Sequence, residues 1–383
     1  MTEDPALHVV LAGGGSAGHI EPALALADAL LRRDPRTEVT CLGTTRGGLD
    51  TKLIPERGYP LELIPAVPMP RKPTIDVFTV PSRLAGTVRR TADVLDKVRA
   101  DVVVGFGGHV ALPAYFAARR RSVPIVVHEA NVRPGLANRI GARMTDWIAV
   151  GSPDCRLSDG RYLGVPLRYA ISHLDRAALR AEAIEFFGLD ADRRTLLVFG
   201  GSLGARRLNE AIEGAAETFS AAGVQIVHAL GRNAWREGEE HPVSGARYVR
   251  VPYLDRMDLA YAAADAVLGR GGMTTCSELA AIGLPAVYVP LPVGNGEQRL
   301  NAKPVVNAGG GLLVEDEQLT PAWLAENLLP LFADGAKLEE MGKAAAEFGR
   351  RDGDEALVDL VYEAVRGGSE TSEMVTETAG AEA

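Results

Sequence analysis

Two glycine-rich loops could each bind an anion, and both follow an apolar run. Loop 13–18 (GGGSAG) comes after VVLA, and loop 200–205 (GGSLGA) comes after LLVF. Each run predicts a buried parallel strand, and each loop opens a segment with helical periodicity. The N–H groups and the positive dipole end of such a helix attract phosphate groups. The repeat therefore predicts two similar nucleotide-type domains.

The first loop fits the dinucleotide pattern G-x-G-x-x-G through Gly13, Gly15 and Gly18, which is weak evidence by itself. A dinucleotide site also needs an acidic residue at the end of the second strand, where it binds the ribose hydroxyls. That strand ends in CLGT at residues 41–44, without a carboxylate. The sequence therefore argues against a dinucleotide site, and a tight turn without a ligand is the alternative.

His19 follows the first loop at the start of a predicted helix. An imidazole with an ordinary pKa of about 6.5 can accept a proton near neutral pH. The positive end of the helix would lower that pKa and favour the neutral ring. A single histidine is more often structural, but its place beside an anion-type loop makes His19 the candidate general base.

A third glycine cluster contains Gly105, Gly107 and Gly108 and follows the strand predicted for residues 101–104. It could hold a second phosphate in the first domain through backbone N–H groups, because the loop contains no basic residue. Close packing of one loop against another is the alternative.

Asn131 follows the predicted strand 125–128, within the sequence HEAN. Polar side chains at the carboxyl ends of parallel strands gather where ligands bind in open α/β sheets. The amide of Asn131 could both donate to and accept from a sugar hydroxyl, although capping a helix is the alternative role.

Residues 270–278 (RGGMTTCSE) follow the strand predicted for 266–268 and begin a helix. Backbone N–H groups of residues 272–275 could hold a diphosphate, and Glu278 could accept from both hydroxyls of a ribose. A carboxylate early in a helix is also simply favourable to the helix dipole. The next strand leads to Gln298, whose amide suits the hydroxyls of a sugar.

Composition excludes several classes of protein. A formal net charge of -9 argues against a general nucleic-acid binder. Cys41, Cys155 and Cys276 are scattered without a CxxC motif, so we expect a reducing compartment, no disulfide framework and no zinc site. We expect no signal peptide and no membrane-spanning segment, since no run of about 18 uncharged apolar residues exists. The P-loop, HExxH and GxSxG motifs are absent, which argues against ATP-driven, zinc-dependent and serine-hydrolase chemistry.

Strand-like and helical runs alternate along all 383 residues, which predicts two domains with parallel sheets. We place the domain junction in the turn-rich segment 159–174. Twelve strands are expected, over residues 8–11, 38–42, 60–64, 101–104, 125–128, 147–150, 195–199, 225–229, 248–251, 266–268, 286–289 and 311–314.

Together these motifs resemble the MurG family, whose members transfer GlcNAc from UDP-GlcNAc to undecaprenyl-pyrophosphoryl-MurNAc-pentapeptide (lipid I) and so form lipid II of peptidoglycan. The resemblance covers residues 8–365. It is carried by GGGSAGHIEPALALADAL, HEANVRPGLAN and PLPVGNGEQRLNA, which are similar to the actinobacterial form. It implies a GT-B fold of the α/β class, with two Rossmann-like domains and an active site in the interdomain cleft. No DxD-like metal motif is evident, so an essential metal is not implied, and no cofactor is expected.

The resemblance assigns the domains. We expect an acceptor-binding, membrane-associating domain over residues 1–164 and a UDP-GlcNAc-binding domain over 165–345. A C-terminal helix over 346–366 would pack back on the first domain. The acidic tail over 367–383 is expected to be disordered.

The resemblance also implies a donor site. Ser16, Ala17 and Gly18 would line the donor side of the first loop, and Asn131 and Gln298 would contact the sugar. Arg168 would lie near the uridine diphosphate, and the backbone of Leu254 would meet uracil. The remaining residues would hold the diphosphate and the ribose: Ser202, Met273, Thr274, Thr275, Cys276, Ser277 and Glu278.

Three positions depart from the usual family pattern. Leu203 stands where the family usually has Gln, Val165 stands where it often has Asn, and RGGMTT at residues 270–275 replaces a more common variant. Backbone contacts would survive these changes, but a side-chain contact at Leu203 would not.

The implied reaction inverts the anomeric centre of GlcNAc. The 4-hydroxyl of MurNAc would attack C1, with His19 as base, while the helix start at 272–275 and Arg168 stabilise the leaving diphosphate. A paralogue with another lipid or natural-product acceptor is an alternative. Others are a hydrolysing UDP-GlcNAc 2-epimerase, whose acidic residues we do not find, and a catalytically weak scaffold of the wall-synthesis complex.

A lipid acceptor implies a peripheral protein on the cytoplasmic face of the cell membrane. Residues 71–80 (RKPTIDVFTV), Arg83, Arg89, Arg90 and the run 119–121 (RRR) would contact the anionic inner surface. A solvated helix face is the alternative. Cell-wall and division proteins are candidate partners, and nucleic acid is not expected.

Overall fold

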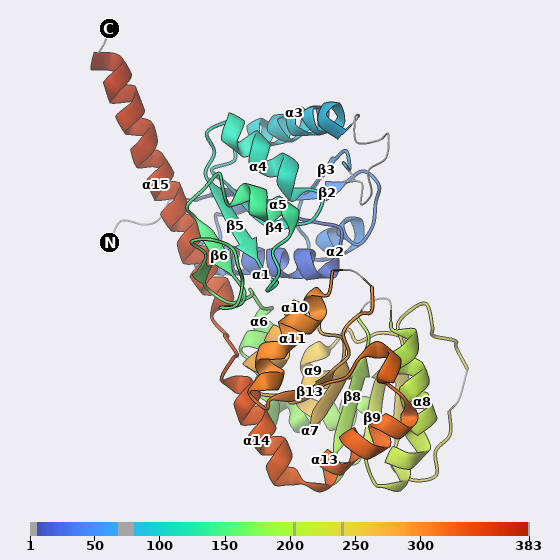
Figure 1. Cartoon of the computed structure of the whole chain (residues 1–383). Coiled ribbons are helices and arrows are strands. Elements are labelled where there is room, and N and C mark those ends of the chain that lie inside the picture. Colours follow the sequence, from blue (N-terminus) through green and yellow to red (C-terminus); the bar gives the residue numbers. More distant parts are fainter. Residues whose placement is uncertain (1–5, 68–79, 202–203, 239–240, 294, 382–383) are drawn as a thin grey trace. The chain divides into compact units, whose positions relative to one another are not determined.

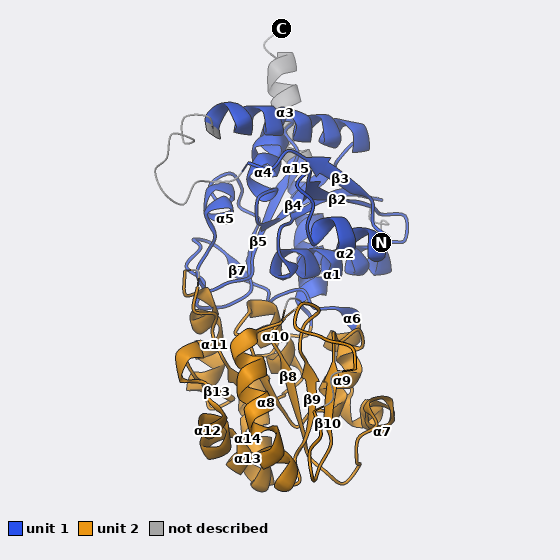
Figure 2. Ribbon diagram, turned by 90° about the vertical axis from the view of Figure 1, so that its right-hand side faces the viewer, with its two compact units in different colours: residues 1–169, 352–383 blue, residues 170–351 orange. Residues whose placement is uncertain are grey.

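The computed structural model describes residues 6–67, 80–201, 204–238, 241–293 and 295–381 (Figure 1). Contacts divide the chain into two units. Unit 1 comprises Met1–Tyr169 and Asp352–Ala383, and unit 2 comprises Ala170–Arg351 (Figure 2). The short helix α6 (Tyr169–Ser172) lies at the boundary between them.

Unit 1 contains a seven-stranded sheet in the order β3-β2-β1-β4-β5-β6-β7, in which every neighbouring pair is parallel. The first four strands along the chain are β1 (His8–Gly13), β2 (Glu38–Thr44), β3 (Leu61–Ile64) and β4 (Val102–Gly107). The other three are β5 (Ile125–Glu129), β6 (Ile148–Val150) and β7 (Arg161–Tyr162). Continuous Val- and Leu-rich runs suit strands that helices cover on both faces.

Two groups of helices cover this sheet. One face packs against α1 (Ala17–Arg33), α2 (Asp50–Glu56) and α15 (Gly353–Ala381), whose buried side chains share one core with the sheet. The other face is covered by α3 (Val80–Val98), α4 (Ala111–Arg120) and α5 (Leu136–Gly141). Alternate residues of β1 belong to the two cores, as the period of a strand requires: Val9 faces the first group, and Val10 faces the second.

The C-terminal helix α15 belongs to unit 1 although it follows unit 2 in sequence. Its residues Leu357 and Val361 are fully buried in the core that α1 and β1 share. Arg32 of α1 donates to Asp354 over 2.5 Å, and the carboxylate of Asp354 is nearly inaccessible. The helix has its last residue at Ala381.

Unit 2 repeats the architecture with a six-stranded parallel sheet in the order β10-β9-β8-β11-β12-β13. Its strands are β8 (Thr195–Phe199), β9 (Gln225–Ala229), β10 (Tyr248–Val251), β11 (Ala266–Gly269), β12 (Ala286–Tyr288) and β13 (Gly311–Leu313). The two parallel sheets that the alternating pattern predicted are thus confirmed, and the short edge strand β7 is the one strand of the described residues that we did not predict.

Helices also cover both faces of the second sheet. One face packs against α7 (Arg176–Phe187), α9 (Met257–Ala263), α10 (Met273–Ala281) and α11 (Glu297–Asn307). The other packs against α8 (Arg206–Ala221), α12 (Pro321–Trp323), the π-helical segment η3 (Leu324–Leu328) and α13 (Leu329–Ala333). The 3-10 helix η2 (Asp316–Gln318) follows β13, and α14 (Gly335–Ala346) contributes side chains to both cores.

Both sheets reverse their strand order between two central neighbours, which are β1 and β4 in unit 1 and β8 and β11 in unit 2. In open α/β sheets, ligands bind beyond the carboxyl ends of strands at such a switch point. The predicted loops 13–18, 105–108 and 270–275, and the described residues of loop 200–205, therefore lie at the two places where the topology favours binding. Within the described ranges, none of the helices combines the length and apolarity that a membrane crossing requires.

Candidate active site

His19 lies in the first turn of α1, directly after the loop that leaves β1. The helix begins at Ala17 with Ser16 as its extended N-cap residue, and Gly18 is exposed in the same turn. The hydroxyl of Ser16 lies 3.0 Å from Nδ1 of His19. The helix start thus holds the imidazole by one ring nitrogen.

The turn between β4 and α4 packs directly against this ring. A Cβ at Gly107 would lie 3.2 Å from Nε2 of His19, and one at Gly108 would lie 3.4 Å from Nδ1 and 2.1 Å from the carbonyl oxygen of Gly14. Gly107 and Gly108 also have φ of 100° and 78°, which favour glycine. The two glycine loops therefore approach each other closely: a side chain at Gly107 would press on the ring, and one at Gly108 would clash with the carbonyl of Gly14.

Burial sets the protonation of His19. Desolvation lowers the pKa of His19, a backbone hydrogen bond with Gly14 opposes that shift, and the neighbouring charge of His109 adds to it. Since its ordinary value is already about 6.5, the ring is neutral near physiological pH. A neutral imidazole is the form that a general base requires.

Gly105 occupies a different environment from the other two glycines. We predicted that the strand ends at residue 104, which is wrong, because β4 continues to Gly107 and pairs with β1 through Gly105 and Gly107. A Cβ at Gly105 would lie 2.0 Å from the hydroxyl of Tyr115. Gly105 therefore leaves room for the buried ring of Tyr115, which belongs to α4. Only Gly107 and Gly108 lie at the carboxyl end of the strand.

Glu129 organises the turn that follows β5. Its Oε1 accepts from the N–H and the Nδ2 of Asn131, at 2.9 and 3.2 Å, and its Oε2 accepts from the N–H of Gly135 at 2.9 Å and from Nδ2 of Asn138 at 3.0 Å. Burial nevertheless raises the pKa of Glu129 above its ordinary value, against the effect of these four bonds. The carboxylate thereby fixes the position of Asn131, the predicted sugar contact.

Asn138 connects this turn to the His19 loop. It accepts from the hydroxyl of Tyr115 over 2.7 Å and donates to the carbonyl of His128 over 3.0 Å. Its Nδ2 would also lie 3.5 Å from a Cβ at Gly107. Unit 1 therefore brings His19, Gly107 and the network around Glu129 to one edge of its sheet.

Arg168 lies in the segment that follows β7, near the end of unit 1. Nε2 of His128 lies 2.9 Å from the carbonyl oxygen of Gly164, which anchors the start of this segment to β5. Burial lowers the pKa of His128 to about 4, so the ring is neutral and donates through Nε2. The departure at Val165 is a buried apolar side chain.

In unit 2, the turn after β11 presents the start of α10. Gly272 is its N-cap residue, and the N–H of Cys276 donates to the carbonyl of Gly272 over 2.9 Å. The N–H groups that precede this first helical bond belong to Met273, Thr274 and Thr275. The Cys276 thiol is buried in the core, which raises its pKa to about 12. The helix can therefore present three N–H groups to an anion.

Glu278 and Leu254 are both buried, while Ser277 is half-buried. Oε2 of Glu278 accepts from the hydroxyl of Tyr261 over 2.7 Å. Leu254 contributes its side chain to the core. The structure thus places the predicted ribose carboxylate one and a half turns into α10, with a tyrosine as partner.

Arg270 and Gln298 shape the loop that follows β12. Arg270 donates to the carbonyls of Val289 and Pro290 and to Asp316 over 3.2, 3.4 and 2.5 Å. Oε1 of Gln298 accepts from the N–H of Leu291 over 2.9 Å. A Cβ at Gly271 would lie 2.5 Å from the carbonyl oxygen of Gln298. The start of α11 thus packs on the turn before α10, which brings Gln298 beside the predicted diphosphate site.

The loop after β8 is only partly described. Ser202, with Leu203, lies outside the described residues. A Cβ at Gly204 would lie 2.1 Å from the carbonyl oxygen of Leu230, so this loop packs against the end of β9.

Sequence reasoning missed Glu129, Asn138 and Tyr261 as hydrogen-bond partners around the candidate site residues. The first two lie in the motif HEANVRPGLAN, which we did recognise, so their polarity after a strand was an available signal. Tyr261 lies in the apolar run LAYAAADAV, which gives no sign of a polar partner.

Both halves of the chain match models of one enzyme family. Residues 9–150 match the glycosyltransferase family 28 N-terminal domain, and residues 195–357 match its C-terminal domain. The chain belongs to glycosyltransferase family 28. The family 28 N-terminal match spans β1 to β6, and the C-terminal match begins with β8 and ends within α15.

Relatives within family 28 identify the branch. Two are UDP-N-acetylglucosamine–N-acetylmuramyl-(pentapeptide) pyrophosphoryl-undecaprenol N-acetylglucosamine transferases. The one from Streptomyces coelicolor is 62% identical over 94% of this chain and 98% of its own length. The one from Thermobifida fusca is 54% identical over 96% and 97%.

The crystal structure of Acinetobacter baumannii MurG has a TM-score of 0.73 and 25% identity to this chain, and the match covers 94% of this chain and all of that one. The GT-B fold and the MurG family that the motifs implied are thereby confirmed.

Proposed function

We propose that this family 28 enzyme transfers GlcNAc from UDP-GlcNAc to the 4-hydroxyl of MurNAc in undecaprenyl-pyrophosphoryl-MurNAc-pentapeptide, with inversion at C1. The near-complete match to transferases of that name, at 62% identity, carries the proposal. The geometry of each unit supplies chemistry that such a transfer needs. A neutral imidazole stands at the edge of one sheet, and a helix start suited to a diphosphate stands at the edge of the other.

In the proposed reaction, His19 is the general base. Ser16 lies against Nδ1, so Nε2 takes the proton of the attacking hydroxyl. The MurNAc oxygen forms a bond to C1 of GlcNAc while the bond between C1 and the β-phosphate oxygen breaks. The electron pair leaves with UDP, and the proton remains on the imidazole. A lowered pKa keeps the base ready but weakens it, which is the compromise expected of a base that works near neutral pH.

The leaving diphosphate would bind at the start of α10. Three N–H groups, from Met273, Thr274 and Thr275, meet the negative charge that grows on the β-phosphate. Loss of one such preorganised donor costs about 3–4 kcal/mol in other enzymes. Arg168 is the candidate cation for the same charge, and Ser202 of the β8 loop is a further candidate contact.

The rest of the donor would be read by side chains of unit 2. Glu278 would accept from the ribose hydroxyls, the backbone of Leu254 would meet uracil, and Gln298 would contact the GlcNAc hydroxyls. The assignment is supported by their positions, because Gln298 packs against Gly271 just before α10 and Glu278 lies within α10 itself.

The acceptor would bind at the edge of unit 1. Gly107 and Gly108 face His19, so a pyrophosphate held by their N–H groups would lie close to the base. Asn131, fixed by Glu129, would contact the sugar.

Access to a lipid acceptor would require the enzyme to bind the cytoplasmic face of the cell membrane as a peripheral protein. Arg83, Arg89 and Arg90 of α3 are exposed, and we call them the α3 arginines. Residues 71–79 of the predicted patch lie outside the described residues. Arg121, by contrast, forms an ion pair with Asp96 over 2.7 Å, which neutralises its charge. Of the predicted patch, the α3 arginines and the exposed Arg119 and Arg120 of α4 therefore remain as described candidates for contact with anionic lipid.

The direct test is transfer of radiolabelled GlcNAc from UDP-GlcNAc to a short-chain lipid I analogue. We expect turnover by the wild type and loss of most turnover in His19→Ala. A matched control is His173→Ala, because His173 is exposed and lies in unit 2. Absence of transfer by folded wild-type enzyme, with transfer to another acceptor, would assign the chain to a paralogue.

A further inference from the structure

Tyr261 and Glu278 form a buried pair on two neighbouring helices of unit 2. Tyr261, on α9, is fully buried, and Glu278, on α10, is 5% exposed. The tyrosine hydroxyl donates to Oε2 of the carboxylate over 2.7 Å. Hydrogen bonds to a charged acceptor are stronger than those between neutral groups. This bond therefore restricts the rotation of the Glu278 carboxylate.

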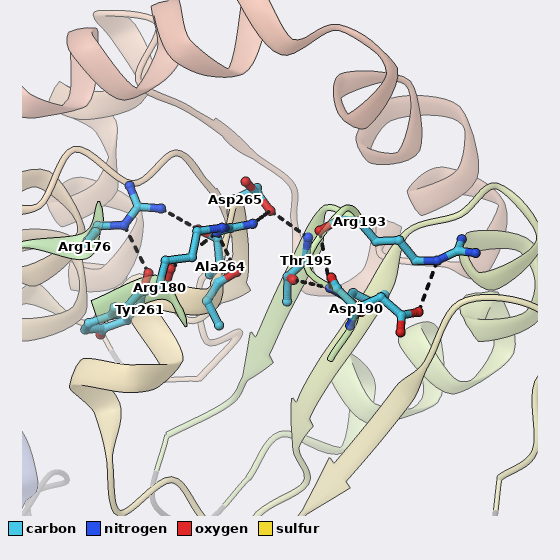
Figure 3. Close-up of polar contacts among 11 residues, drawn as sticks. Arg176, Arg180, Asp190, Arg193, Thr195, Tyr261, Ala264 and Asp265 are labelled. Carbon is cyan, nitrogen blue, oxygen red and sulfur yellow. Dashed lines mark hydrogen bonds and ion pairs between the residues drawn. The ribbon is translucent and has the colours of Figure 1, made fainter. Parts of the chain in front are cut away.

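The helix that carries Tyr261 is itself fixed by two arginines of α7. Arg176 donates from Nε to the carbonyl of Tyr261 over 3.0 Å and from its Nη2 to the carbonyl of Ala264, and Figure 3 shows both contacts. Arg180 donates to the carbonyls of Ala262 and Ala263 over 3.4 and 3.1 Å. These are the final carbonyls of α9, which have no partner within a helix, and a cation there also suits the helix dipole.

Asp265 connects this arrangement to the central strand of the sheet. Its Oδ2 accepts from Nη2 of Arg180 over 3.2 Å and from the N–H of Thr195, at the start of β8, over 2.7 Å (Figure 3). The end of α9 is thus bonded to α7 and, through Asp265, to β8. The carbonyl of Tyr261 is one of the bonded groups. Arg176, Arg180 and Asp265 therefore together fix the position of the Tyr261 backbone.

The bond to Glu278 is more than a means of burying a tyrosine. Tyr288 belongs to the same hydrophobic cluster and is also fully buried. Its hydroxyl has no hydrogen-bond partner among the residues that the structure describes. This core therefore tolerates a tyrosine hydroxyl without a polar partner, and the pairing of Tyr261 with Glu278 calls for a separate explanation.

We propose that Tyr261 is a positioning residue that orients the Glu278 carboxylate toward the ribose of the donor nucleotide, with Arg176 and Arg180 holding α9 in place. The inference rests on the donor role of Glu278 in the proposed function. A carboxylate has about four lone-pair positions, and the hydroxyl of Tyr261 takes one of them, so this bond can orient the carboxylate and still be compatible with a ribose hydroxyl as donor. Tyr261 itself touches no reacting atom, so its loss should weaken ribose binding and spare the chemical step.

The test compares Tyr261→Phe with Tyr288→Phe, which removes a hydroxyl of the same kind from the same core. KM and kcat are measured with UDP-GlcNAc and with its 2′-deoxyribose analogue. For Tyr261→Phe we expect KM for UDP-GlcNAc to rise about tenfold, as loss of one bond to a charged group implies, with kcat within about twofold. The preference for UDP-GlcNAc over the deoxy analogue should fall by a similar factor, and Tyr288→Phe should change neither quantity.

Two further variants separate the inference from the proposed function. If Glu278→Gln leaves the ribose preference unchanged, the donor role of Glu278 is wrong, and the role of Tyr261 falls with it. If Glu278→Gln abolishes the preference while Tyr261→Phe behaves like Tyr288→Phe, only the positioning role is overturned. The double variant Tyr261→Phe/Glu278→Gln should be no worse than Glu278→Gln alone, because the two side chains act as one unit.

If Tyr261→Phe does not fold, a variant of α7 can test the same inference. Arg180→Lys keeps the charge but cannot donate to Ala262, Ala263 and Asp265 together, since it lacks the planar fork of the guanidinium. It should raise KM for UDP-GlcNAc about threefold, which corresponds to roughly 0.6 kcal/mol. It should also lower the preference for UDP-GlcNAc over the deoxy analogue, as Tyr261→Phe does. An unchanged ribose preference in a folded Arg180→Lys enzyme would contradict the role assigned to the α7 arginines.

Discussion

The variant Glu129→Gln tests the hydrogen bonds that the Glu129 carboxylate accepts in the turn after β5. The carboxylate accepts four hydrogen bonds, two on each oxygen. An amide keeps one oxygen as acceptor and presents an NH2 group in place of the other. Whichever way it is oriented, two donors of the turn would then face another donor. The change in volume is small, so the variant tests polarity without creating a cavity.

The magnitude follows from the bonds that are lost. Two hydrogen bonds to a charged acceptor contribute about 1.5 kcal/mol each at the low end, which is about 3 kcal/mol together. Against this, burial raises the pKa of Glu129, so the folded protein already disfavours its charge, and a neutral amide recovers part of that cost. We therefore expect local opening of the turn to become easier by about 2 kcal/mol, or roughly 30-fold.

Amide hydrogen exchange measures how easily the turn opens. The N–H groups of Asn131 and Gly135 both donate to Glu129, so the peptide 129–138 should lose protection by about that factor. The N–H of Gly151 donates to the backbone carbonyl of Glu129 over 2.8 Å and serves as an internal control. Unchanged exchange in peptide 129–138 would refute the view that the carboxylate maintains the turn. Increased exchange throughout unit 1 would show a global effect instead.

Three other predictions concern the base, the C-terminal helix and the membrane. The pKa of His19 is lowered and the neutral ring is the active form, so kcat/KM should fall only on acidification below about pH 6.5. His19→Ala should lose this acidic limb of the pH profile. A midpoint of the acidic limb above about pH 6.5 would contradict the role of His19 as base. Leu357→Ala in α15 should destabilise unit 1 by about 2–5 kcal/mol in calorimetry, while the half-exposed Leu136→Ala should change stability by less than about 0.5 kcal/mol. Charge reversal of the α3 arginines to glutamate should lower binding to anionic vesicles in flotation by at least about tenfold, since each basic residue near the surface contributes about 1 kcal/mol. Equal flotation would exclude these residues, and neutral vesicles provide the control.

The two sheets were predictable because strand and helix periods alternate clearly along the chain. Most strand positions agree to within two residues, and the main error concerns β4. There, Gly105 was read as the end of a strand, since glycine usually weakens one. The structure keeps the strand because Tyr115 fills the space above Gly105. Only the fold reveals that the missing side chain is replaced by a ring from α4.

The site was predictable where a motif follows a strand and unpredictable where partners are distant in sequence. His19 and the α10 turn follow their strands directly, so the switch-point rule places them correctly at a sheet edge. Tyr261 precedes Glu278 by a full strand and turn, and Arg270 reaches Asp316 across β12 and β13. Sequence spacing carries no information about such pairs, because helix packing and strand order create them.

The two glycine loops that look alike in the sequence serve different purposes in the fold. In unit 1, Gly108 allows the β4 turn to press against the carbonyl of Gly14, and this contact seats His19. In unit 2, Gly204 presses against the carbonyl of Leu230, a contact that involves no titratable side chain. Glycine is required in both loops for close approach, whether or not a phosphate binds there. The similarity of the loops therefore identifies two sheet edges, and the chemistry of each edge depends on the side chains that the neighbouring strand brings to it.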